Sequence, residues 1–99
     1  MKILITGAAG LVGGATVRYC RSIGDEVIAA RRGDLDIAKR ESVFAFLQRE
    51  KPDSVINCAA WTNVDGCETD DQKNWAANAY GVENLALGCR NIGANLVTI

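Results

Sequence analysis

The chain has 99 residues, of which 48% are hydrophobic and 23% are charged. This length and balance fit one small globular domain and exclude a tandem array or a separate substrate domain. Eleven Lys and Arg against twelve Asp and Glu give a formal net charge of -1, which disfavours binding to nucleic acid or to an anionic membrane surface. No apolar run approaches the roughly 18 residues that span a bilayer, so we expect a cytoplasmic protein whose partners are small molecules or proteins.

Histidine and cysteine usage narrows the possible chemistry. The chain has no histidine, which excludes Ser-His-Asp hydrolysis and His-ligated zinc. Its four cysteines, Cys20, Cys58, Cys67 and Cys89, show no Cys-x-x-Cys spacing. Three of them lie in segments predicted below as helix or strand, so we expect core thiols and no metal site.

The first half of the chain predicts an alternation of strands and helices. The aliphatic run Lys2–Thr6 indicates a buried strand, and residues 11–23 place apolar side chains on one helical face. Glu26–Ala30 is predicted as a second strand. A second helix around residues 43–47 ends before Pro52, because proline disfavours a helical conformation in the residue before it.

The second half continues the series. A third strand is predicted over residues 54–60, a polar loop over 62–71, a helix from Trp75 to Ile92 and a fourth strand over 95–99. Alternation of this kind predicts an α/β fold with a Rossmann-like parallel sheet of order 3-2-1-4 and helices on both faces. We expect residues 1–99 to be the N-terminal part of an NAD(P)-binding Rossmann domain, truncated after the fourth strand. The apolar edge of that strand predicts self-association.

A glycine-rich loop joins the first strand to the first helix. Residues 7–13 read Gly-Ala-Ala-Gly-Leu-Val-Gly, a GxxGxxG motif in the strand-to-helix context that dinucleotide binding requires. The first glycine permits a tight turn, the second lets backbone N–H groups approach a pyrophosphate, and the third lets the helix lie close to the sheet. The alternative is three glycines that serve only the turn and the packing. The residues expected at the cofactor are Gly7, Gly10, Leu11, Val12 and Gly13.

The end of the second strand indicates which dinucleotide is bound. An acid at this position binds the ribose 2′-OH of NAD, whereas arginine accommodates the 2′-phosphate of NADP. The chain has Arg31 and Arg32 here, and no acid before Asp34. This pattern favours NADP, with NAD possible if Asp34 reaches the ribose. The alternative is that both arginines are solvated loop charges.

Two later segments carry a resemblance. Residues 35–37 read Leu-Asp-Ile, and residues 52–65 read PDSVINCAAWTNVD. With the GxxGxxG loop, they resemble the extended short-chain dehydrogenase/reductase superfamily, and in particular its dTDP-4-dehydrorhamnose reductase group. The resemblance covers essentially the whole chain. It implies that Asp36 and Ile37 lie against the adenine, that Ala59 and Ala60 lie beside the ribose and nicotinamide, and that Asn78 orients the active-site backbone and water.

The resemblance also implies a function. Thr62 and Val64 would border a sugar-nucleotide pocket, and hydride would pass to a 4-keto-6-deoxy sugar. Members of this superfamily protonate the substrate with a Ser or Thr and a Tyr-Lys pair four residues apart. Tyr80 is followed four residues later by Asn84, so we interpret Tyr80 as a packing residue and expect no catalytic residue in this chain. Alternatives are a sugar-nucleotide epimerase or dehydratase of the same superfamily, a non-catalytic NADP-binding regulatory subunit, or a fragment that binds nothing tightly.

Overall fold

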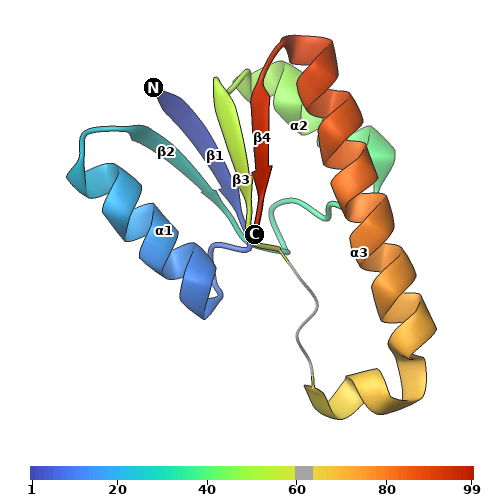
Figure 1. Cartoon of the computed structure of the whole chain (residues 1–99). Coiled ribbons are helices and arrows are strands. Elements are labelled where there is room, and N and C mark those ends of the chain that lie inside the picture. Colours follow the sequence, from blue (N-terminus) through green and yellow to red (C-terminus); the bar gives the residue numbers. More distant parts are fainter. Residues whose placement is uncertain (60–63) are drawn as a thin grey trace.

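The structure is a computed structural model that describes the backbone of residues 1–59 and 64–99 and the side chains of residues 1–59 and 78–99. Strands and helices alternate as the sequence predicted (Figure 1). The elements are β1 (Lys2–Thr6), α1 (Leu11–Ser22), β2 (Glu26–Ala30), α2 (Arg40–Glu50), β3 (Ser54–Asn57), α3 (Val64–Ile92) and β4 (Asn95–Thr98). The loop predicted over residues 62–71 is wrong from Val64 onward, where α3 begins. Its polar composition suggested a loop, but acidic residues such as Asp65 also favour the start of a helix.

The four strands form one parallel sheet in the order β2-β1-β3-β4. Leu4 of β1 pairs with Ile28 of β2 on one side and with Val55 of β3 on the other. The α/β class and the Rossmann-like parallel sheet are therefore confirmed. The predicted order 3-2-1-4 is wrong, because the third strand pairs with the first strand and the fourth strand pairs with the third.

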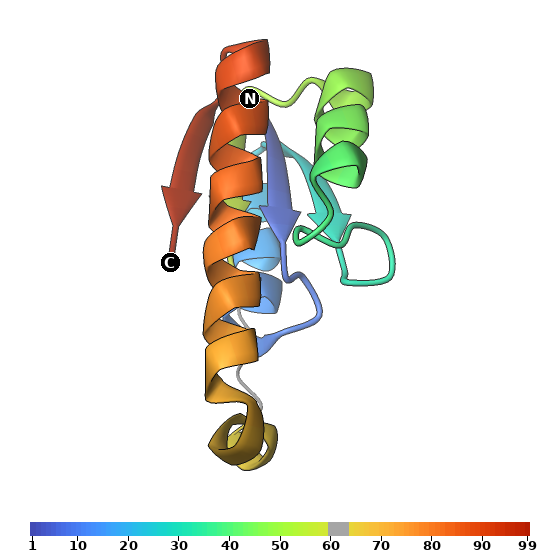
Figure 2. The same cartoon turned by 90° about the vertical axis from the view of Figure 1, so that its right-hand side faces the viewer.

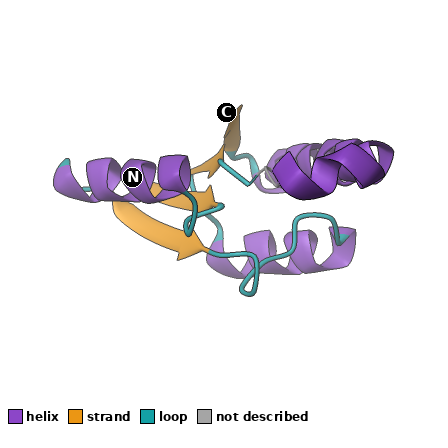
Figure 3. Cartoon of the chain, turned by 90° about the horizontal axis from the view of Figure 1, so that it is seen from below, coloured by secondary structure: helices purple, strands orange, loops and turns teal. Residues whose placement is uncertain are grey.

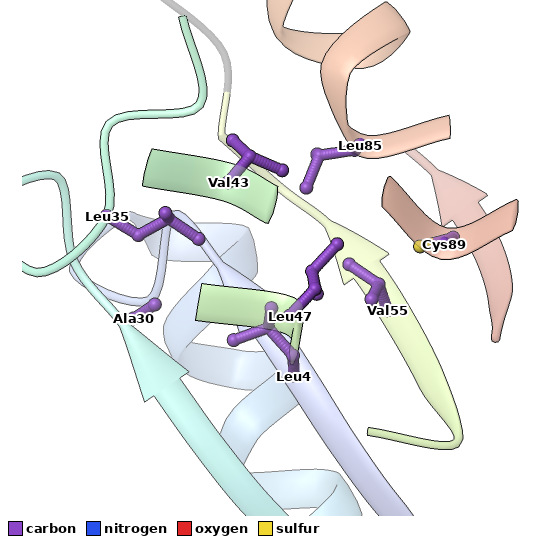
Figure 4. Close-up of a cluster of buried hydrophobic side chains, with 8 residues drawn as sticks. All are labelled: Leu4, Ala30, Leu35, Val43, Leu47, Val55, Leu85 and Cys89. Atoms are coloured by element: carbon purple, nitrogen blue, oxygen red, sulfur yellow. The ribbon is translucent and has the colours of Figure 1, made fainter. Parts of the chain in front are cut away.

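The position of α2 explains this order. Its buried residues Val43 and Leu47 pack with Leu4 and Val55, so α2 covers β1 and β3 together (Figure 4). In a right-handed crossover, the face on which the helix lies decides on which side the next strand is added. A helix on one face moves the chain one way across the sheet, and a helix on the other face moves it the opposite way. Because α2 lies on the face opposite α1, the chain returns past β1 after leaving β2.

The two faces of the sheet have separate cores because successive strand residues point to opposite sides. On one face Ile3 and Ile5 pack with Val17 and Cys20 of α1. On the other face Leu4 belongs to the cluster that α2 and α3 cover. Figure 2 looks onto the face covered by α2 and α3, with α1 behind the strands, and Figure 3 shows the strands between the two groups of helices.

Two glycines of α3 lie where the helix meets other parts of the chain. A Cβ at Gly88 would lie 2.5 Å from Cδ1 of Leu47, and one at Gly81 would lie 2.5 Å from Cδ1 of Ile37. Each glycine lowers helix propensity by about 1 kcal/mol relative to alanine. Both are explained by close packing that leaves no room for a side chain.

Cysteines contribute to both cores. Cys20 and Cys89 are buried free thiols, as predicted, and Cys58 is half-buried. Burial raises the pKa of the Cys89 thiol. The side chain of Cys67 lies outside the described residues.

The sheet ends at β4, which pairs with β3. Val97 and Ile99 at this edge are 54% and 67% exposed. Within the part of the chain that the structure describes, no helix has both the length and the apolar character needed to cross a membrane.

Candidate dinucleotide site

A cavity of ≈ 550 Å³ lies at the carboxyl ends of β1 and β3, the point at which the strand order reverses. In open parallel sheets, ligands bind at this point. The wall is formed by the glycine-rich loop with the start of α1, the segment after β2, the end of β3 and one residue of α3. The lining residues are Gly7, Ala9, Gly10, Leu11, Val12, Gly13, Arg32, Leu35, Asp36, Ile37, Ala38, Cys58, Ala59 and Asn78.

Two glycines of the loop are required by the protein itself. Gly7 has φ +68°, and a Cβ there would lie 2.6 Å from the carbonyl carbon of Cys58. A Cβ at Gly13 would overlap the carbonyl oxygen of Gly7 and lie 2.7 Å from its carbonyl carbon. Gly7 therefore lets the loop approach the end of β3, and Gly13 lets α1 approach the loop.

Gly10 has no comparable internal reason to be glycine. Its backbone is extended, with φ -77° and ψ 170°, and the nearest atom to an added Cβ would be the carbonyl oxygen of Gly7 at 3.4 Å. Gly10 nevertheless lines the cavity, and a side chain there would occupy space beside the start of α1. The space that Gly10 leaves open fits a group brought by a ligand.

The start of α1 suits an anion. Gly10 is the N-cap residue, it makes no side-chain cap, and the first turn contains no acidic residue. The first intrahelical bond runs from the Gly14 N–H to the Gly10 carbonyl oxygen, at 2.8 Å. The N–H groups of Leu11, Val12 and Gly13 lie before that first bond, at the positive end of the helix dipole. Such an end binds phosphate groups readily.

Asn57 joins the carboxyl ends of β1 and β3. Its side chain is buried, and its Oδ1 accepts hydrogen bonds from the Thr6 hydroxyl at 2.6 Å and from the Ala59 N–H at 3.1 Å. The Cys58 N–H donates to the Thr6 carbonyl oxygen at 3.2 Å. Asn57 thereby fixes Ala59 in the cavity wall. Asn57 was given no role from the sequence, although a polar residue at the end of an apolar strand is a usable signal.

The two arginines after β2 differ in position. Both side chains are exposed, but Arg32 lines the cavity and Arg31 lies outside its wall. The Asp34 carboxylate accepts a hydrogen bond from the Arg31 N–H at 3.0 Å, and the Asp34 N–H donates to the Arg31 carbonyl oxygen at 2.9 Å. Asp34 thus closes its own turn and does not line the cavity.

A second hollow, of ≈ 500 Å³, adjoins this turn and shares Arg32, Leu35 and Asp36 with the first cavity. Lys39 and Arg49 also line it. Its charged residues comprise three cations and the carboxylates of two aspartates. Both carboxylates accept hydrogen bonds from backbone N–H groups of the same segment. The region beside Arg32 therefore has a net positive charge.

Most of the predicted site residues that the structure describes meet at one cavity. Those in its wall are Gly7, Gly10, Leu11, Val12, Gly13, Arg32, Asp36, Ile37, Ala59 and Asn78. Ala60, Thr62 and the side chain of Val64 lie outside the described residues. Four further lining residues were not predicted, and they are Ala9, Leu35, Ala38 and Cys58. Tyr80 was interpreted as a packing residue, but most of its side chain is exposed, at 59%.

Several of the known proteins that this chain resembles are reductases. The chain is 39% identical over 94 residues to dTDP-4-keto-6-deoxy-D-glucose reductase of Streptomyces niveus, an alignment that covers 95% of this chain and 33% of the relative. A dTDP-4-dehydrorhamnose reductase structure from Clostridium acetobutylicum superposes with a TM-score of 0.89 and 42% identity, covering 97% of this chain and 34% of that one. A second such reductase, from Bacillus anthracis in complex with NADP, gives a TM-score of 0.87 and 29% identity, covering 96% and 34%.

The chain therefore spans about a third of the length of these relatives. The sequence profile of the family described as the RmlD substrate binding domain matches residues 1–99. The resemblance to the dTDP-4-dehydrorhamnose reductase group is confirmed, and the chain belongs to the RmlD substrate binding domain family.

Proposed function

We propose that this chain is the dinucleotide-binding part of an NADP-dependent reductase that acts on a dTDP-linked 4-keto-6-deoxy sugar. The observation that carries the proposal is the open space at Gly10, a glycine that neither its backbone conformation nor its packing requires, beside a helix start without a side-chain cap. A pyrophosphate placed there would receive the N–H groups of the first turn of α1. The substrate class is proposed from the names of the relatives, and the cofactor is proposed from the Bacillus anthracis reductase structure, which is a complex with NADP.

The lining residues suggest how the cofactor would be held. Arg32, with the net positive charge beside it, would bind the 2′-phosphate of NADP. Asp36 and Ile37 would flank the adenine, and Ala59 would lie beside the ribose and nicotinamide. Asn78 would orient the active-site backbone and water. The bound dihydronicotinamide would supply the hydride.

The remaining parts of the reaction are assigned by the same proposal. Ala60 would continue the nicotinamide wall, and Thr62 and Val64 would border the sugar nucleotide. The proton that accompanies the hydride would come from residues of the whole protein outside this chain, since Tyr80 has Asn84 and not lysine four residues later. Arg31 would contribute only long-range charge.

Titration of the chain with NADP⁺ and with NAD⁺, followed by calorimetry, tests the proposal. We expect Gly10→Val to abolish binding of both, because its side chain fills the space for the pyrophosphate. Arg32→Ala should weaken NADP⁺ binding by about tenfold to a hundredfold, the range for lost hydrogen bonds to a charged group, and leave NAD⁺ binding nearly unchanged. Arg21→Ala is the control, because it removes the same charge at the far end of α1. Absence of binding to the wild-type chain, or equal binding by Gly10→Val, would refute the proposal.

A second proposal concerns β4. β4 is an edge strand of the described sheet, with the exposed Val97 within it and the exposed Ile99 directly after it, and such an edge can pair with another chain. We propose that the 99-residue chain self-associates through this edge. Sedimentation should show a concentration-dependent dimer that Val97→Lys suppresses, and a stable monomer at all concentrations would contradict this.

A further inference from the structure

Asn84 of α3 connects the helix to the segment that walls the cavity. Its side chain is buried, with 3% of its surface exposed. Its Nδ2 donates to the Ile37 carbonyl oxygen at 2.9 Å, and its Oδ1 accepts from Nε of Arg40 at 3.0 Å. The bond from Arg40 fixes the orientation of the amide, so that its N–H group faces Ile37. Glu83 adds an ion pair to Arg40 at 3.3 Å.

One turn before Asn84, Gly81 receives the side chain of Ile37. A Cβ at Gly81 would lie 2.5 Å from Cδ1 and 2.7 Å from Cγ1 of Ile37. The Ile37 side chain therefore rests against the helix backbone where another residue would have its own side chain. Backbone and side chain of Ile37 are thus both held by α3, one by a hydrogen bond and the other by close packing.

The segment that these contacts hold is neither helix nor strand. Residues 31–39 leave β2, pass beside α3 and reach the start of α2 (Figure 1). The bonds within the segment are local: the Asp36 carboxylate accepts from the Ala38 N–H at 3.0 Å, and the Asp36 carbonyl oxygen accepts from the Lys39 N–H at 3.1 Å. Local bonds fix the shape of the turn, whereas the bond from Asn84 fixes its distance from α3.

We infer that Asn84 is a positioning residue for the adenosine end of the dinucleotide, acting with Gly81 to hold Asp36 and Ile37 at the correct depth in the cavity wall. The inference rests on the proposed function, because it takes the cavity to bind a dinucleotide. Neither residue lines the cavity. Their effect is on the conformation of the wall before the ligand arrives, and preorganisation of this kind increases affinity.

Asn84→Asp separates this role from general stability. A carboxylate at this position can still accept the hydrogen bond from Arg40, but it cannot donate to the Ile37 carbonyl oxygen and would repel it. Asn91→Asp is the matched control, since it makes the same change at an exposed position of the same helix. Gly81→Ala is the second variant. It raises helix propensity while forcing Ile37 away from α3.

The chain and its variants are compared by calorimetry with NADP⁺ and with 2′,5′-ADP, the adenosine half of the cofactor, well below their unfolding temperatures. We expect Asn84→Asp and Gly81→Ala to weaken both ligands by about threefold to tenfold, the loss of about one hydrogen bond, and Asn91→Asp to bind as the wild type does. The Cδ1 methyl resonance of Ile37 in the free protein should shift in the first two variants and stay in place in the control.

The outcomes separate the inference from the proposed function. If Asn84→Asp or Gly81→Ala is folded and binds 2′,5′-ADP with the wild-type affinity, the inference is overturned. If Asn84→Asp does not fold, Gly81→Ala decides the question alone, because it removes no buried hydrogen bond. A folded wild-type chain that binds neither NADP⁺ nor 2′,5′-ADP would refute the proposed function, and this inference with it.

Discussion

Gly10 and Gly13 stand three residues apart in one loop, and the structure predicts opposite consequences for the same substitution. At Gly13 an added methyl group would overlap the backbone of Gly7, so alanine should disturb the fold. At Gly10 the methyl group meets its nearest atom at 3.4 Å and should be accommodated. It would stand, however, in the space that we assign to the pyrophosphate.

The magnitudes follow from these contacts. Overpacking against a rigid backbone costs about 1–3 kcal/mol, and the overlap at Gly13 places it near the upper limit. The higher helix propensity of alanine offsets up to about 1 kcal/mol of this cost. Gly13→Ala should therefore lower the free energy of unfolding by about 2 kcal/mol. For a domain of this size, that loss lowers Tm by about 10 °C. Gly10→Ala should cost at most about 1 kcal/mol, through the weaker preference for alanine at an N-cap.

Urea denaturation and NADP⁺ titration of both variants check the prediction. Gly10→Ala should keep most of the stability and lose at least about tenfold in NADP⁺ affinity, which corresponds to about 1.4 kcal/mol. Gly13→Ala should be the less stable protein. The reasoning is refuted if Gly13→Ala is as stable as the wild type, or if Gly10→Ala loses as much stability as Gly13→Ala.

Three further predictions concern the interior. Asn57→Val leaves the buried Thr6 hydroxyl without its acceptor, so the free energy of unfolding measured in urea should fall by about 1–3 kcal/mol. Gly88→Ala should destabilise the wild-type chain, because the new methyl group would contact Leu47. The same substitution should cost less free energy of unfolding in a chain that already carries Leu47→Ala. A double-mutant cycle in urea with simply additive effects would contradict this. Burial raises the pKa of the Cys89 thiol in the folded chain, so stability is fully present below the pKa of the unfolded thiol and falls as the pH rises above about 8.5. Cys89→Ala should reduce this fall in urea titrations between pH 8 and 10, and an unchanged slope would refute it.

The predicted cofactor residues meet at one cavity, whereas the predicted order of the strands is wrong. The glycine loop is recognisable because its requirements are local: a strand before it, a helix after it and three glycines at fixed spacing. The order of strands depends on which face of the sheet α2 covers. The periodicity of Val43 and Leu47 shows that α2 has an apolar face, and both faces of the sheet offer an apolar surface to receive it.

Neighbouring residues with the same chemistry could not be separated by sequence. Arg31 and Arg32 were predicted together, but only Arg32 lines the cavity. The backbone of Arg31 closes a turn with Asp34. Asn57 and Asn84 were not given roles, because a buried polar residue is recognised by its partners. Their partners, such as Thr6 and Ile37, are 51 and 47 residues away in the sequence.

The predicted cofactor residues come together at one cavity in spite of the wrong strand order, and the reason is the position of β1. In both orders the switch point lies beside β1, between the first and fourth strands in the predicted order and between β1 and β3 in the observed one, so the loop after β1 opens into the crevice in both cases. The observed order changes the opposite wall of that crevice. No strand lies beyond β2 in the described sheet, and residues 31–39 pack instead through Leu35 into the core and through Ile37 onto α3. The wall that we assign to the adenosine end is therefore a loop, whose position depends on contacts with α3 as well as on packing against the sheet.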